Sequence, residues 1–218
     1  MRIYFYLFFL TIFSCQEFSK NSIKDNSYNI DLPYYNEPTF TPIWLDRSNS
    51  KINNFHSIKT FNFQNQDGKW ISQNDLKGKI YIANFFFTSC STVCPKMASN
   101  LLKVQKEFSD NDKVKILSHT VMPWFDDQKR LKKYGDVNNI DSKFWYLLTG
   151  SKDKIYKIAR ESYFADEGFG KSVTNHDDFI HTENFFLIDS KNKIRAIYNG
   201  TLPLETRRMI EDIKSLLK

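Results

Sequence analysis

An almost uninterrupted apolar stretch, residues 80–87, lies near the middle of the chain and ends at Thr88. An apolar run of this length, without polar alternation, is typical of a strand that is buried on both faces of a sheet. Beyond it, apolar residues recur at the spacing of a helix: Met97, Leu101, Val104 and Phe108. A buried strand that leads directly into a helix favours a layered α/β domain.

The rest of the chain continues this alternation. Further strands are predicted over residues 114–121, 144–148, 185–188 and 194–198, and further helices over residues 124–134, 151–160 and 204–217. Turn residues at 64–69 and 189–193 each indicate a hairpin between strands. We therefore expect a thioredoxin-like α/β fold over residues 51–218, with a central mixed β-sheet flanked by helices and an N-terminal hairpin.

Charge argues against a nucleic-acid partner. The chain has 31 Lys and Arg against 25 Asp and Glu, a net charge of +6. Both signs are scattered along the sequence with no block of five like charges, which is typical of a solvated surface. A nucleic-acid interface would gather the basic residues on one face, and the sequence shows no such pattern.

The first residues predict export and lipid attachment. Residues 3–13 are almost wholly apolar, which is too short for a membrane-spanning helix but suits the core of a signal peptide. The run ends at Ser14-Cys15, which resembles a bacterial lipobox. We therefore predict a lipoprotein signal peptide over residues 1–14, with Cys15 lipidated. A plain signal peptide or an uncleaved anchor with an incidental cysteine is the alternative.

A lipid on Cys15 would attach the chain to a bacterial membrane of the cell envelope, with the domain facing the periplasm or the exterior. Residues 15–50 are mostly polar and are predicted to form a membrane tether. Aromatic residues and prolines at 32–44 interrupt the tether, and we expect them to form an extended segment that packs on the domain.

Cys90 and Cys94 lie where the central strand enters the helix. Free backbone N–H groups and the helix dipole stabilise a thiolate at such a position. Residues four apart lie on the same side of a helix, so both sulfurs could bind one metal ion or join in a disulfide. Two buried structural cysteines, or a permanent disulfide, are the alternatives.

Two thiolates leave a copper or zinc site incomplete, so a third ligand is sought among the four histidines. His181 precedes the predicted strand 185–188, which should neighbour the central strand and bring its entry loop beside the cysteines. His119 lies within a strand and could simply pack in the core. His56 and His176 are interpreted as surface residues.

Three segments together resemble the Sco (SenC) family of copper chaperones. The sequence FFTSCSTVCP, residues 86–95, resembles the central motif of that family, and HTENFFLID, residues 181–189, resembles its histidine motif. The Leu-Thr-Gly segment at residues 148–150 resembles a third conserved part of the family. The similarity extends over about residues 58–198.

This resemblance implies a membrane-tethered metallochaperone rather than an enzyme. Its copper would be bound by Cys90, Cys94 and His181, and delivered to, or used to prepare, the dinuclear copper site of cytochrome c oxidase. The implied partners are the copper-accepting subunit of the oxidase and an upstream copper donor. Two thiolates and an imidazole are also donors that suit Cu(I).

One departure from the family concerns a carboxylate. Where the family has Val-Asp-Pro, this chain has Met122 before Pro123. The missing acid is associated in the family with positioning the partner or the site. Asp126 and Asp127 lie close enough in sequence to replace it, and Met122 is either an additional soft ligand or a packing residue.

Two other functions remain open at this point. An extracytoplasmic thiol-disulfide oxidoreductase would use Cys90 or Cys94 as nucleophile and the other as resolving thiol. The C-x-x-x-C spacing, in place of C-x-x-C, weighs against it. A lipoprotein whose domain only binds a partner would leave the paired cysteines without a role.

Overall fold

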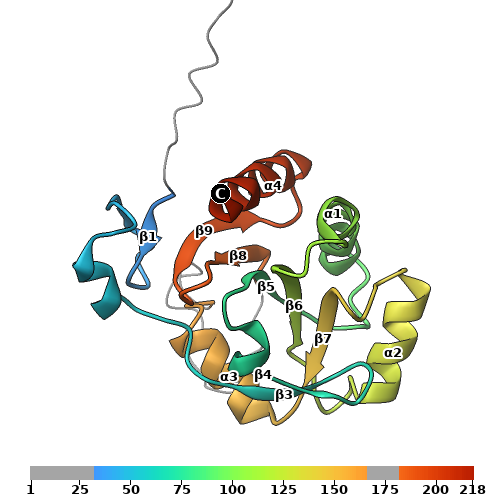
Figure 1. Ribbon diagram of the computed structural model, residues 1–218. Coiled ribbons are helices and arrows are strands. Elements are labelled where there is room, and N and C mark those ends of the chain that lie inside the picture. Colours follow the sequence, from blue (N-terminus) through green and yellow to red (C-terminus); the bar gives the residue numbers. More distant parts are fainter. Residues whose placement is uncertain (1–31, 166–181) are drawn as a thin grey trace, which may run out of the picture. The chain divides into compact units, whose positions relative to one another are not determined.

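A computed structural model describes residues 32–165 and 182–218 of the chain (Figure 1). The described strands are β1 (Tyr34–Tyr35), β2 (Pro42–Ile43), β3 (Asn62–Asn65), β4 (Trp70–Ser72), β5 (Ile80–Phe86), β6 (Val114–Thr120), β7 (Trp145–Thr149), β8 (Asn184–Ile188) and β9 (Ile194–Asn199). The α-helices are α1 (Val93–Phe108), α2 (Gln128–Val137), α3 (Lys152–Glu161) and α4 (Pro203–Leu217), with short 3-10 helices at Ser50–Asn54 and Gln73–Leu76.

All nine strands form one mixed sheet in the order β2-β1-β9-β8-β5-β6-β7-β3-β4. β5 lies at its centre, parallel to β6 and antiparallel to β8, and all seven of its residues are buried. Helices cover both faces of the sheet, with α1 and α4 together on one side and α3 on the other (Figure 1). The predicted α/β fold with a mixed sheet flanked by helices is confirmed.

Alternation along β5 divides the core in two. Ile82 and Phe86 pack beneath α1 and α4, in the same cluster as Cys94. Ala83 and Phe85 point to the opposite face and pack with α3. This division follows because successive side chains of a strand point to opposite faces. Beyond the end of β5, both Cys90 and Cys94 pack with the cluster on the α1 side.

Several element boundaries follow the predictions closely. The expected N-terminal hairpin is β3–β4, and Gly68 in its turn has a φ of +78°, which glycine adopts without strain. The helix expected over residues 124–134 begins only at Gln128, because the Asp127 side chain caps it and accepts a hydrogen bond from the Arg130 N–H at 2.7 Å. Residues 122–127 therefore form a loop.

The folded unit starts earlier than expected. Among the described residues it already includes Leu32, whereas we expected residues up to 50 to form a tether. The described part of that stretch contains β1, which pairs with both β2 and β9. The expectation that an extended aromatic segment packs on the domain is correct, but this segment is a strand of the sheet.

Arg195 explains why this segment is held. Its guanidinium is buried and pairs with Asp189 at 3.1 Å. It donates from Nε to the carbonyl of Pro33 at 3.0 Å and from Nη2 to the carbonyl of Leu32, and it stacks over the ring of Tyr34. One buried arginine from β9 therefore donates hydrogen bonds to two backbone carbonyls just before β1. Composition alone could not reveal this contact.

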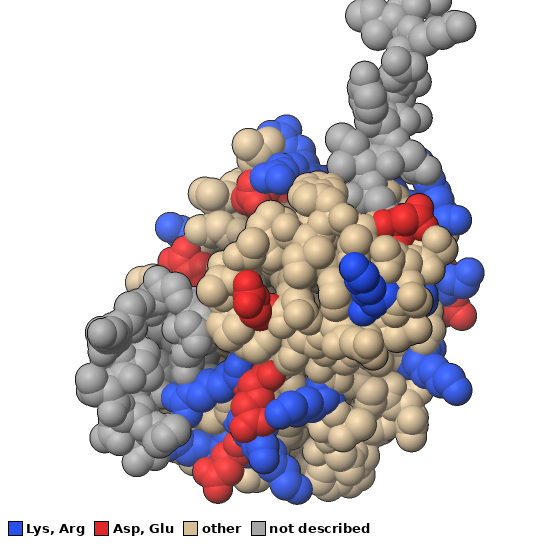
Figure 2. Space-filling model, turned by 90° about the vertical axis from the view of Figure 1, so that its left-hand side faces the viewer, with Lys and Arg blue, Asp and Glu red and all other residues tan. Residues whose placement is uncertain are grey.

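The described surface carries charges of both signs. On the face shown in Figure 2, Lys and Arg side chains are interspersed with Asp and Glu. None of the helices in residues 32–165 and 182–218 is long and apolar enough to cross a membrane.

Candidate metal centre

The two cysteines lie in and just after the loop that joins β5 to α1, residues 87–92, which we call the cysteine loop. β5 ends at Phe86 and α1 begins at Val93, so Cys94 is in the first helical turn and Cys90 in the loop before it. Cys94 is buried, Cys90 is half-buried, and both are free thiols. Pro95 fits here because N–H groups in the first turn have no partner within the helix.

The helix start makes the two thiols chemically different. The Cys94 N–H donates to Cys90 Sγ at 3.3 Å. Burial alone would raise the pKa of Cys90, but hydrogen bonds from the backbone N–H groups of Cys94, Thr92 and Val93 and from the Cys94 side chain lower it below its usual value. Burial raises the pKa of Cys94 to about 12. Cys90 is thus the thiol that ionises first, and Cys94 keeps its proton at neutral pH.

Tyr134 lies close to both thiols, although sequence reasoning did not select it. Its ring contacts Phe86 at a centroid distance of 5.4 Å. Burial raises the pKa of its phenol, and the nearby Cys94, Cys90 and Asp126 raise it further. Together with Thr88 and residues of α2 it lines a surface pocket of about 480 Å³. A phenol that stays protonated therefore lies beside the thiol pair.

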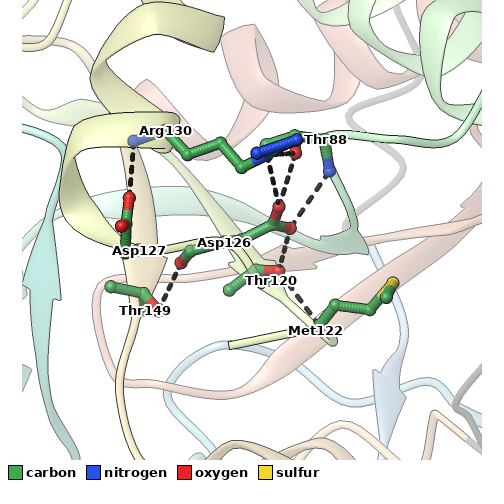
Figure 3. A network of polar contacts seen from close by, with 7 residues as sticks. All are labelled: Thr88, Thr120, Met122, Asp126, Asp127, Arg130 and Thr149. Atoms are coloured by element: carbon green, nitrogen blue, oxygen red, sulfur yellow. Dashed lines mark hydrogen bonds and ion pairs between the residues drawn. The ribbon is translucent and has the colours of Figure 1, made fainter. Parts of the chain in front are cut away.

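The structure separates the two carboxylates that were considered as replacements for the family's missing acid. Asp127 is exposed and caps α2. Asp126 is fully buried and accepts hydrogen bonds from both the N–H and the hydroxyl of Thr88, at the start of the cysteine loop (Figure 3). Met122 is half-buried and donates its N–H to the Thr120 hydroxyl at 3.1 Å.

His119 is part of the core on the other face of the sheet from Cys94. It is fully buried and stacks on Phe85, with Phe61, Phe63 and Tyr163 around it. Neither ring nitrogen has a hydrogen-bond partner among residues 32–165 and 182–218, and burial lowers the pKa of His119 to about 3. The expectation that His119 packs in the core is correct.

His56 is not the solvated surface residue that we expected. Its ring is half-buried, with Nε2 2.8 Å from the carbonyl of Ser162 and a centroid distance of 4.4 Å to Phe164. The segment before β3 is anchored to the end of α3, and this contact encloses the imidazole.

Cys15, His176 and His181 lie outside the described residues. Within the described ranges, the cysteine pair is joined by no third His, Cys, Asp or Glu in a group that could hold a metal ion. The described part of the chain therefore supplies two soft donors, one readily ionised, at a helix start. Such a pair can bind a soft cation or be oxidised to a disulfide.

Comparison with known proteins decides the family. A family model described as SCO1/SenC matches residues 49–218. The chain belongs to the SCO1/SenC family. A SCO1 protein homolog of Bacillus subtilis is 35% identical over 162 residues, which cover 73% of this chain and 82% of that protein.

Solved structures of SCO1/SenC proteins have the same fold. A SCO1/SenC family lipoprotein from Bacillus anthracis is 34% identical, with a TM-score of 0.64 over 75% of this chain and 96% of that one. BsSco, described as a member of the Sco family of cytochrome c oxidase assembly proteins with a disulfide switch, is 35% identical, with a TM-score of 0.62 over 75% and 95%. The predicted thioredoxin-like architecture and the resemblance to Sco proteins are confirmed.

Copper is bound in a more distantly similar solved structure. ScoI of Bradyrhizobium japonicum, 24% identical with a TM-score of 0.56 over 72% of this chain and 98% of that one, has been solved with copper bound.

Proposed function

We propose that this chain is a copper metallochaperone that binds one Cu(I) through Cys90, Cys94 and His181. The observation that carries the proposal is the pair of free thiols four residues apart at the β5–α1 junction, one of them with a lowered pKa. Thiolates select soft ions such as Cu(I), and a three-coordinate site keeps an edge open for transfer. The copper-bound structure of Bradyrhizobium japonicum ScoI supports copper as the metal.

The topology supports His181 as the third ligand. β8 is antiparallel to β5, with Ala83 opposite Phe186. Since β5 ends in the cysteine loop, the chain enters β8 at the same edge of the sheet. His181 precedes Asn184, the first residue of β8, by only three positions. An imidazole added to two thiolates would complete a site for Cu(I).

Relatives of the chain support a partner and a cellular location. BsSco is described as a member of a family of cytochrome c oxidase assembly proteins. The copper bound by this chain would accordingly be delivered to, or used to prepare, the dinuclear copper site of the oxidase, after loading from an upstream donor. A lipid on Cys15 would hold the domain on a bacterial membrane of the cell envelope, facing the periplasm or the exterior, and the similarity to the Bacillus anthracis lipoprotein supports such an anchor.

A thiol-disulfide oxidoreductase remains the second candidate, and one observation favours it. The half-exposed Cys90 has a lowered pKa and the buried Cys94 a raised one, as a nucleophilic and a resolving thiol would have. The disulfide switch described for BsSco is consistent with such chemistry. Reversible oxidation of Cys90 and Cys94 is also compatible with a chaperone, because only the dithiol would bind copper.

Anaerobic Cu(I) titration of the reduced chain against a competing chelator tests this proposal. We expect one Cu(I) per chain, with affinity reduced at least ~100-fold in Cys90→Ser and in Cys94→Ser, because each variant removes a thiolate ligand. Cys15→Ser is the matched control and should bind copper as the wild type does. Full binding by both site variants would overturn the proposal, and rapid catalysed reduction of insulin disulfides would favour the oxidoreductase.

A further inference from the structure

The cysteine loop has few attachments to the rest of the domain. Two of its hydrogen bonds are local: Cys90 N–H to the Phe87 carbonyl at 3.3 Å, and Cys94 N–H to Cys90 Sγ at 3.3 Å. In the part of the chain that the structure describes, the hydrogen bonds from residues 88–92 to segments outside residues 87–94 all involve Thr88. The position of the loop therefore depends on what holds Thr88.

A single buried carboxylate holds it. Asp126 Oδ2 accepts the Thr88 N–H at 3.0 Å, and Oδ1 accepts the Thr88 hydroxyl at 2.5 Å (Figure 3). The Thr120 hydroxyl, at the end of β6, donates to Oδ2 at 2.5 Å. Three hydrogen bonds thus converge on one carboxyl group, two from the loop and one from the end of β6, and they link the loop to the sheet.

The carboxylate is itself fixed in place. The Thr149 hydroxyl, at the end of β7, donates to the Asp126 carbonyl at 2.9 Å. Arg130 Nε lies 3.9 Å from Asp126 Oδ1 and donates to the Thr88 hydroxyl at 3.2 Å, while its guanidinium stacks on Phe125 at 3.8 Å. Asp126 is thus held by the ends of two strands and by the first turns of α2, which are rigid elements.

We propose that Asp126 is a positioning residue for the cysteine pair, which acts through Thr88 to hold the loop in the geometry that presents Cys90 next to Cys94. Thr88 precedes Cys90 by two residues, so a displaced Thr88 would move the Cys90 sulfur away from the Cys94 N–H. The expected change in Cu(I) affinity rests on the proposed copper site. The expected change in reactivity of the metal-free thiols does not.

The chemistry of the contact explains why a carboxylate is used. The side chain of an aspartate offers two acceptor oxygens, which suits the three donors that converge here from Thr88 and Thr120. An amide offers one acceptor oxygen and turns an N–H₂ group toward one of the hydroxyls. Asp126→Asn therefore disrupts the link while it preserves the shape of the side chain.

Two matched pairs of variants test the proposal in the full chain. Thr88→Val removes the hydroxyl but leaves the shape, the backbone N–H and the charge of Asp126, whereas Thr88→Ser keeps the hydroxyl. Asp126→Asn is paired with Asp75→Asn, which alters a carboxylate that accepts the N–H and the hydroxyl of Ser72 at the start of the 3-10 helix Gln73–Leu76. The Asp126 variant and its control distinguish a general loss of stability from a displaced cysteine loop. The two Thr88 variants remain informative even where Asp126→Asn fails to fold.

The first readout needs no metal. In the reduced, metal-free chain at one fixed pH, iodoacetamide should modify the half-exposed Cys90 faster than the buried Cys94, as resolved by mass spectrometry. We expect this selectivity to fall at least ~3-fold in Thr88→Val and in Asp126→Asn, since a loosened loop uncovers Cys94. Thr88→Ser and Asp75→Asn should keep the wild-type selectivity.

The second readout is Cu(I) affinity, measured by chelator competition. Loss of a supporting residue around a metal site typically weakens binding ~10- to 100-fold, and we expect a decrease in this range for Asp126→Asn, a smaller one for Thr88→Val, and recovery in Thr88→Ser. Unchanged selectivity and affinity in a folded Thr88→Val variant would overturn the proposal. A wild-type chain that binds no copper, but whose selectivity falls in Thr88→Val, would contradict the proposed function and leave the positioning role standing.

Discussion

Arg195→Met is expected to lower the free energy of unfolding by ~3–5 kcal/mol, the cost of removing one partner from a buried ion pair. The substitution leaves Asp189 buried without its cation at 3.1 Å, and it leaves the carbonyls of Leu32 and Pro33 without their donor. Chemical denaturation followed by circular dichroism measures the loss. Limited proteolysis should also cut near β1, because the same side chain holds that strand in place.

Arg208→Met is the matched control for this prediction. Arg208 forms an ion pair with Glu205 at 2.8 Å, but its side chain is 65% exposed. Exposed pairs of this kind contribute at most ~1 kcal/mol, so the control should unfold close to the wild type. An equal loss of stability in the two variants would show that burial of Arg195 is not the reason for its importance.

His119 should make the protein sensitive to acid. Burial lowers its pKa from 6.5 to about 3, so the native state resists a proton that the unfolded chain accepts. The stability that the neutral ring provides is complete above pH 6.5 and is lost progressively as the pH falls from 6.5 towards 3. Between pH 6.5 and pH 4.5 this single group should cost ~2–3 kcal/mol, at about 1.4 kcal/mol per pH unit.

His119→Leu isolates this effect, because leucine is apolar and of similar size. The comparison uses the change in unfolding free energy between pH 6.5 and pH 4.5 in each protein, so a constant difference in packing cancels. We expect the variant to lose ~2–3 kcal/mol less than the wild type over this interval. The same loss in both proteins would mean that the buried ring does not control acid stability.

Most of the architecture could be predicted from periodicity. The apolar run at residues 80–87 identified the central strand, and the turn at Asp67-Gly68 identified the β3–β4 hairpin, since both depend on local sequence. The same local signals placed Cys90 and Cys94 at a strand-to-helix junction, where the structure has them. Such predictions succeed because the hydrophobic pattern and the backbone turn are set within a few residues.

Long-range polar contacts could not be predicted in this way. Asp126 is joined to Thr88 across 38 positions and Arg195 to Leu32 across 163, and neither pair has a local signature. The sequence marks Asp126 only as a candidate for the family's missing acid and gives Arg195 no signal, because only the fold brings their partners together. The early start of the folded unit and the link from Asp126 to the cysteine loop were missed for this one reason.

Copper K-edge X-ray absorption on the Cu(I)-loaded chain tests the three-ligand site most directly. We predict two sulfur scatterers and one nitrogen scatterer in the wild type and in a His176→Ala control, because Cu(I) would be bound by Cys90, Cys94 and His181. His181→Ala should lose the nitrogen scatterer and bind copper more weakly. A spectrum of His181→Ala identical to that of the wild type, or a third sulfur in place of nitrogen, would contradict the proposed site.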